Sequence, residues 1–86
     1  MKQKKVVIYS KENCPYCTWA KQLLDKNHVT FQEIRVDVNE GEREKMERLS
    51  GRRTVPQIFI GEKHVGGYDD LKSLYDKGEL DTWLAN

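Results

Sequence analysis

The spacing of Cys14 and Cys17 constrains the fold more than any other feature, because the pair lies where a strand pattern gives way to a helix pattern. Residues 5–9 contain an unbroken run of apolar, mostly β-branched side chains, which predicts a strand buried on both faces. Pro15 suits the first position of a helix, where its missing N–H costs nothing. The expected helix ends at Asn27, and its apolar face consists of Cys17, Ala20, Leu23 and Leu24. The sequence therefore predicts a cysteine at a helix start, directly after a buried strand.

A second strand region comes next, and the helix between the two strands implies that they pair in parallel. Its apolar residues are Val29, Phe31, Ile34, Val36 and Val38. Residues 40–49 are heavily charged, and we expect an exposed helix there that lies over the sheet. Opposite charges at Arg43/Glu47 and Glu44/Arg48 support an exposed helix there.

The last third of the chain has the pattern of a hairpin followed by helices. Gln57–Ile60 and residues 63–65 flank Gly61-Glu62, which is typical of an antiparallel hairpin. Asp69 or Asp70 is expected to cap a helix that stops at Gly78. The apolar residues of this helix and of a final short turn are Leu71, Leu74, Tyr75, Leu80, Trp83 and Leu84. We interpret Trp19, Phe59, Tyr75 and Trp83 as packing residues.

These elements predict an α/β fold in the order β-α-β-α-β-β-α-α, with a four-stranded mixed sheet flanked by helices. Residues 1–86 are expected to form a single domain, because two domains would need roughly 100 residues each.

Charge and hydropathy exclude several classes of partner. Fifteen basic and fourteen acidic residues leave a formal net charge of +1, which argues against a nucleic-acid binder. The longest apolar run, Val6 to Tyr9, is far shorter than the roughly 20 residues of a membrane span, and too short for a secretory signal. We therefore expect a cytoplasmic protein that binds neither nucleic acid nor membrane.

The two cysteines carry the chemistry that the sequence predicts. In a reducing compartment such a close pair is redox-active or metal-binding, because the loop it closes is too small to stabilise the chain much. At a helix start, the free N–H groups of Tyr16 and Cys17 and the helix dipole stabilise a thiolate at Cys14, and Lys11 adds a positive charge. Cys17 lies one turn inside, on the core face. We therefore expect Cys14 to attack a disulfide and Cys17 to resolve the mixed disulfide that results.

Zinc and haem are weaker interpretations of this pair. A structural zinc site needs four ligands, and the remaining candidates, His28 and His64, are far apart in the sequence. A haem attachment motif needs histidine directly after the second cysteine, where this chain has Thr18. We expect no metal.

Three motifs taken together resemble those of a known family. Cys14-Pro15-Tyr16-Cys17, Thr54-Val55-Pro56 and Gly66-Gly67-Tyr68-Asp69-Asp70 have the order and spacing found in dithiol glutaredoxins of the small bacterial type. The resemblance covers nearly all of the chain and implies a thioredoxin-like fold. It also implies reversible thiol–disulfide exchange with glutathione as co-substrate, and with glutathione reductase and NADPH as the upstream electron source.

The resemblance further implies where glutathione binds. The Val55–Pro56 peptide bond is expected to be cis and opposite the cysteines, with the Val55 backbone paired with the cysteinyl unit of glutathione. Arg52 or Arg53, together with Lys11, is a candidate for the glycine carboxylate. The helix start near Asp70 is expected to hold the γ-glutamyl end. The implied set is Lys11, Tyr16, Arg53, Thr54, Val55, Pro56, Gly67, Tyr68, Asp69 and Asp70, with a redox-active disulfide between Cys14 and Cys17.

Two alternatives stay open at this point. A thioredoxin-like donor with its own reductase fits less well, because Asn13 replaces the tryptophan expected before the first cysteine and the first strand lacks a buried acid. An iron–sulfur cluster carrier fits less well because Pro15 resembles the catalytic subtype of the family. The expected partners are glutathionylated or disulfide-containing proteins, with ribonucleotide reductase as one candidate. The expected state is a monomer.

Overall fold

The computed structural model describes residues 3–85 and contains a four-stranded sheet in the order β2-β1-β3-β4. The predicted order of elements and the mixed sheet are confirmed. The elements are β1 (Val6–Ser10), α1 (Pro15–Lys26), β2 (Gln32–Arg35), α2 (Glu42–Ser50), β3 (Gln57–Ile60), β4 (Lys63–Gly66), α3 (Tyr68–Asp76) and α4 (Leu80–Leu84).

β1 lies inside the sheet and fixes the position of the loop that carries Cys14. It pairs in parallel with β2, as expected for two strands joined by a helical crossover, and antiparallel with β3. β3 and β4 form the predicted hairpin, with Gly61 in the turn at a positive φ of 60°. Because β1 and β3 are antiparallel neighbours, the loop after β1 and the loop before β3 lie at the same end of the sheet.

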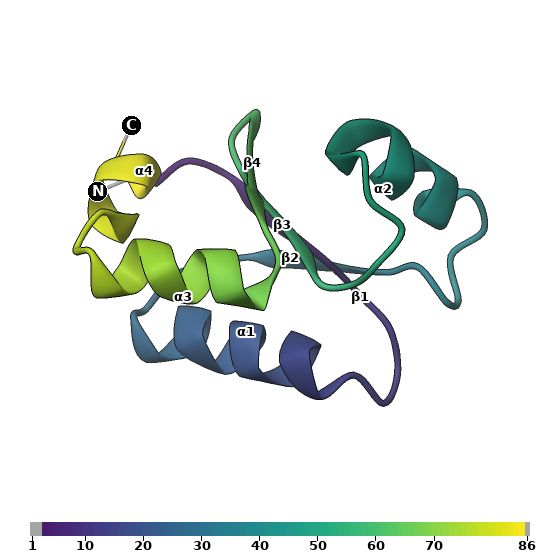
Figure 1. The fold of residues 1–86 in the computed structure, drawn as a ribbon, viewed down its shortest axis with the longest axis horizontal. Helices are drawn as coiled ribbons and strands as arrows, with labels where there is room; N and C mark the ends of the chain where they lie inside the picture. The colour runs from purple at the N-terminus through teal and green to yellow at the C-terminus, as the bar shows by residue number, and fades with distance from the viewer. Residues whose placement is uncertain (1–2, 86) are drawn as a thin grey trace.

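The helices cover the two faces of the sheet unequally. In Figure 1, α1 and α3 lie side by side on one face, and α2 lies on the other. The larger core cluster forms on the α1 and α3 side, where Val6 and Ile8 of β1 meet Ala20 and Leu24 of α1. Its other buried members are Val29, Ile58, Ile60, Leu71, Leu74, Leu80 and Leu84.

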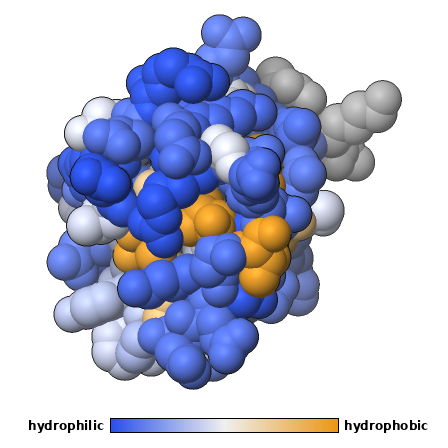
Figure 2. Space-filling model, turned by 90° about the vertical axis from the view of Figure 1, so that its right-hand side faces the viewer, coloured by the Kyte–Doolittle hydropathy of each residue, from blue (hydrophilic) through white to orange (hydrophobic). Residues whose placement is uncertain are grey.

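The smaller core cluster lies under α2 and is less completely covered. It consists of Tyr9, Val36, Met46 and Phe59, with partly buried apolar neighbours around it. Figure 2 looks at the side of the molecule where α2 lies, and shows apolar surface in the middle of that face, ringed by hydrophilic side chains. A helix of nine residues is too short to cover the whole face of the sheet.

The second strand is shorter than the sequence predicts. β2 covers only Gln32–Arg35, and the valines beyond it lie in turns. Val36 still reaches the smaller core cluster, whereas Val38 is 69% exposed. The pairing of β2 with β1 ends at Ser10 and Arg35. The apolar residues continue beyond this point, so the strand predicted from them is too long.

The predicted exposed helix is confirmed as α2, but its opposite charges do not pair with one another. Within residues 3–85, neither Arg43/Glu47 nor Glu44/Arg48 forms an ion pair, because two of these side chains contact the loop after the helix. Arg43 donates to the carbonyl oxygen of Arg53 at 3.1 Å, and Glu47 lies 3.5 Å from the Arg53 guanidinium. α2 is thus tied to the segment that leads into β3.

No helix within residues 3–85 is both long enough and apolar enough to cross a lipid bilayer.

Candidate active site

Cys14 and Cys17 form a disulfide at the start of α1, with their Cα atoms 5.2 Å apart. Cys14 is the N-cap residue and Pro15 the first helical residue, as predicted. The backbone N–H of Cys17 donates to the Cys14 sulfur at 3.1 Å, the contact expected to stabilise a thiolate after reduction. Cys14 is 9% exposed and Cys17 only 1%. The predicted asymmetry of exposure between the two cysteines is therefore confirmed.

The loop before β3 brings backbone groups next to the reactive sulfur. The Val55–Pro56 peptide bond is cis, as expected. The carbonyl oxygen of Val55 lies 4.0 Å from the Cys14 sulfur. A groove of about 190 Å³ continues from this loop toward the start of α3. Its lining residues are Tyr16, Arg52, Thr54, Val55, Pro56, Gln57, Gly67, Tyr68, Asp69 and Asp70.

The far end of the groove is the N-terminus of α3, where Asp70 caps the helix from inside its first turn and not as the N-cap residue. Gly67, not Asp69 or Asp70, is the N-cap residue. Asp70, three positions later, accepts a hydrogen bond from the Gly67 N–H at 3.0 Å and contacts Arg52 at 3.4 Å. Gly66 has a φ of 123°, and any side chain there would overlap the Asp70 carboxylate. The glycine therefore allows the carboxylate to turn back over the helix start.

Two of the predicted glutathione-binding residues do not line this groove. Arg53 lies against Glu47 of α2, and Lys11 lines a different hollow. Arg52, the other arginine that the sequence offers, lines the groove in place of Arg53. Arg52 and Arg53 are adjacent, but their side chains point in different directions. Arg52 contacts Asp70 at the groove, whereas Arg53 contacts Glu47 of α2. The other eight predicted residues all line the groove.

Two aromatic rings line the groove, Tyr16 of α1 and Tyr68 of α3, and Trp19 packs against both. Tyr16 packs against Trp19 with ring centroids 5.1 Å apart, and Tyr68 lies 5.9 to 6.1 Å from both. Trp19 is 47% exposed and Tyr75 41%, so both lie at the surface, where Trp19 packs on the two tyrosines as the predicted packing residue. The other two predicted packing residues are confirmed, because Phe59 is buried and Trp83 packs against the larger core.

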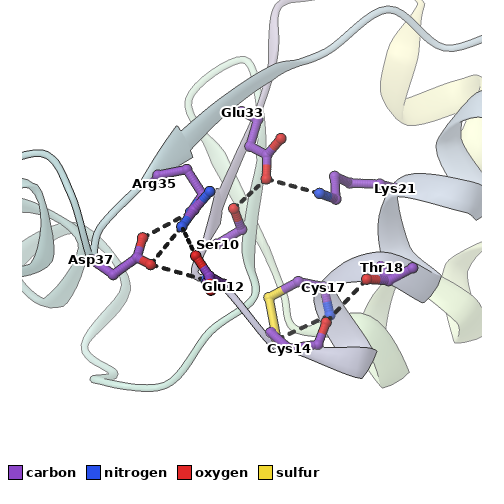
Figure 3. Close-up of polar contacts among 9 residues, drawn as sticks. All are labelled: Ser10, Glu12, Cys14, Cys17, Thr18, Lys21, Glu33, Arg35 and Asp37. Atoms are coloured by element: carbon purple, nitrogen blue, oxygen red, sulfur yellow. Dashed lines mark hydrogen bonds and ion pairs between the residues drawn. A yellow bond between two sulfur atoms is a disulfide. The ribbon is translucent and has the colours of Figure 1, made fainter.

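A charged hollow of about 480 Å³ also reaches both cysteines. In Figure 3, Glu33 of β2 extends toward Lys21 of α1, with Nζ to Oε2 at 2.9 Å, and accepts from the buried Ser10 hydroxyl at 2.5 Å. The Ser10 hydrogen bond is the main cause that holds the pKa of Glu33 below its usual value, and Lys21 adds to it. The Glu33 carboxylate and the Lys21 ammonium group are therefore paired with each other within the protein.

A second ion pair at this hollow ties the loop after β1 to the end of β2. Arg35 donates to Asp37 at 2.6 and 2.8 Å, and Asp37 also accepts from the Glu12 backbone N–H at 3.0 Å (Figure 3). The Arg35 guanidinium keeps the pKa of Asp37 well below its usual range. Within residues 3–85, no group of three or more His, Cys, Asp or Glu side chains is arranged to hold a metal ion.

The sequence does not indicate Gln57 as a site residue and offers His64 only as a candidate metal ligand, yet both side chains support the groove. Gln57 is 1% exposed and donates to the carbonyl oxygen of Thr54 at 3.0 Å. Its side-chain oxygen lies 2.7 Å from Nε2 of His64 on the neighbouring strand. A polar residue inside the apolar stretch of β3 is the sequence signal that indicates such a network.

Comparisons with known proteins agree with this geometry. The family model described as Glutaredoxin matches residues 6–65. The chain is 54% identical to glutaredoxin 3 of Escherichia coli over 79 residues, which cover 92% of this chain and 95% of that protein.

Solved structures of similar proteins have the same fold. The solution structure of glutaredoxin from Brucella melitensis is 46% identical with a TM-score of 0.85, covering 98% of this chain and 91% of that one. The crystal structure of a buckwheat glutaredoxin–glutathione complex is 35% identical with a TM-score of 0.84. The match covers 92% of this chain and 74% of that one.

Proposed function

The chain belongs to the glutaredoxin family, and we propose that it reduces protein disulfides and glutathione mixed disulfides with glutathione as its reductant. Family membership supports the coarser role of a thiol–disulfide oxidoreductase. The observation that carries the glutathione assignment is the groove that begins beside the Cys14 sulfur and ends at the Asp70 carboxylate and the Arg52 guanidinium. Such a groove suits a short peptide that carries both charges and a thiol.

The groove offers a partner to each part of glutathione. The Val55 backbone next to Cys14 is available to pair with the cysteinyl unit, in the manner of an added strand. The first N–H groups of α3 and the Asp70 carboxylate suit the carboxylate and the amine of the γ-glutamyl end. Arg52, 3.4 Å from Asp70, is the cation at the groove for a carboxylate of glutathione. The buckwheat relative crystallised with glutathione supports this assignment, because its chain superposes on this one.

On a glutathione mixed disulfide, the proposed route uses only Cys14. Its thiolate attacks the glutathione sulfur, the protein sulfur leaves as a thiolate, and that thiolate takes up a proton. The thiolate of a second glutathione attacks the new mixed disulfide, releasing Cys14 and forming oxidised glutathione. Glutathione reductase then reduces the oxidised glutathione with electrons from NADPH.

On a protein disulfide, the proposed route uses both cysteines. Cys14 forms a mixed disulfide with the substrate, and the thiolate of Cys17 attacks the Cys14 sulfur, releasing the second substrate thiol. The Cys14–Cys17 disulfide in the structure corresponds to the product of that step. Two glutathione molecules then return the pair to the dithiol form. The proposed partners are disulfide-containing and glutathionylated proteins, and ribonucleotide reductase is one candidate. The proposed location is the cytoplasm, where the reducing conditions suit this chemistry.

Replacing Asp70 with asparagine is expected to raise the KM for a glutathione mixed disulfide by about five- to tenfold, because a charged contact to the amine is lost. Asparagine still offers an oxygen to the Gly67 N–H, so the start of α3 is expected to persist. Steady-state kinetics with NADPH-coupled glutathione reductase measures the effect.

The matched control for this experiment is Asp76→Asn, which removes a carboxylate from the same helix, where its partner is Lys72. Asp76→Asn is expected to leave the KM unchanged. An equal KM for the Asp70 variant and the wild type would contradict the placement of glutathione in this groove.

A further inference from the structure

Gln57 is an almost fully buried polar side chain at the wall of the groove. It is the first residue of β3, and its Nε2 donates to the Thr54 carbonyl oxygen at 3.0 Å and to the Thr54 hydroxyl at 3.3 Å. A buried amide that lacks hydrogen-bond partners destabilises the folded protein, so these contacts hold its orientation. The two contacts fix the residue that precedes Val55.

The orientation of this amide also fixes the proton on His64. A carbonyl oxygen accepts and never donates, so the amide nitrogen of Gln57 must face Thr54 and its oxygen must face His64. Nε2 of His64, 2.7 Å from that oxygen, must therefore carry a hydrogen. The His64 ring also packs on Phe59, with centroids 4.9 Å apart. Burial lowers the pKa of His64, Arg52 lowers it further, and Asp70 opposes them.

The segment that Gln57 holds has few other anchors. Within residues 3–85, no backbone–backbone hydrogen bond outside the regular elements involves residues 52–56. The N–H of Arg52 donates to the Ser50 hydroxyl, and the carbonyl oxygen of Arg53 accepts from Arg43. At Thr54, next to the residue that faces Cys14, the contacts come from Gln57.

We propose that Gln57 and His64 are positioning residues: acting through Thr54, they hold the Val55 backbone in the orientation that receives the cysteinyl unit of glutathione. This inference rests on the proposed function and adds a second layer to its site. His64 fixes Gln57, Gln57 fixes Thr54, and Thr54 limits the rotation of the Val55 peptide groups. A loop held in this way loses little conformational entropy when the substrate binds. The substrate therefore binds more tightly than it would to a flexible loop.

The test replaces each member of the chain of contacts and measures kcat and KM separately. Gln57→Leu removes both polar ends, and His64→Phe keeps a ring against Phe59 but removes the Nε2 donor. Both variants are expected to raise the KM for a glutathione mixed disulfide, Gln57→Leu by about tenfold, with kcat changed by less than about twofold. Gln22→Leu, an exposed glutamine of α1, is the matched control and is expected to leave both constants unchanged.

A spectroscopic readout separates this role from a general loss of stability. The ¹⁵N spectrum of the His64 ring at neutral pH is expected to show a neutral imidazole with its hydrogen on Nε2. In Gln57→Leu this hydrogen is expected to exchange faster with solvent. A hydrogen on Nδ1 in the wild type, or an unchanged KM in both variants, would overturn the inference. If Gln57→Leu does not fold, the inference is tested by the KM of His64→Phe and by the position of the ring hydrogen in the wild type.

Failure of the proposed function would look different. A wild-type protein that does not turn over glutathione mixed disulfides would contradict the glutathione assignment, whatever the ring spectrum of His64 shows. A wild type that is active, with variants that keep the same KM, would contradict only the positioning role.

Discussion

Replacing Cys14 with serine is expected to abolish both the reduction of glutathione mixed disulfides and the reduction of protein disulfides. A serine hydroxyl stays protonated at neutral pH and does not attack a disulfide. Cys17 cannot take over, because it is 1% exposed and lies one turn inside α1, away from the groove. Activity at the limit of detection in both assays is the expected result.

Titration of the reduced protein tests the reason for this loss. The ultraviolet absorbance of thiolate is expected to show one thiol with a pKa below the usual value of about 8.5, because the Cys17 N–H and the helix dipole favour the charged form of Cys14. In Cys14→Ser this low-pKa transition is expected to disappear, and in Cys17→Ser it is expected to remain. Two thiols that both titrate at the usual value would contradict the assignment of Cys14 as the nucleophile.

Replacing Cys17 with serine is expected to separate the two routes. Removal of glutathione from a protein needs only Cys14, so this activity is expected to stay or rise, because the intermediate is no longer diverted into the internal disulfide. Reduction of a protein disulfide by the dithiol route is expected to lose most of its rate. Cys17, whose Cα is 5.2 Å from that of Cys14, acts at an effective concentration that free glutathione rarely matches.

A paired assay on this one variant measures the separation. One substrate is a glutathionylated protein and the other a protein disulfide, both supplied with glutathione, glutathione reductase and NADPH. Equal loss of the two activities would mean that Cys17 is structural, or that the roles of the cysteines are reversed. Cys14→Ser serves as the control that loses both.

The parts of the site that depend on local sequence could be predicted. Pro15 fixes where α1 begins, and the helix start in turn leaves Cys14 less buried than Cys17. The apolar run before them predicted the buried strand to within one residue. These features depend on neighbours a few positions apart, which a sequence displays directly.

The parts that depend on contacts between distant segments could not be predicted from the residues. Arg52 and Arg53 are equivalent in sequence, and only the position of Asp70, eighteen residues after Arg52, brings Arg52 to the groove. The pairing of Gln57 with His64 depends on the register of the β3–β4 hairpin. Trp19 has an apolar ring that predicts burial, yet it packs on Tyr16 and Tyr68 at the surface.

A comparison of two electron donors tests the central claim most directly. The wild-type protein is given one protein disulfide and NADPH, either with glutathione and glutathione reductase or with thioredoxin reductase alone, and the consumption of NADPH is measured over time. We predict rapid consumption with glutathione, saturable in glutathione concentration, and only background consumption with thioredoxin reductase. Equal or faster consumption with thioredoxin reductase, and none that depends on glutathione, would contradict the assignment of glutathione as the reductant.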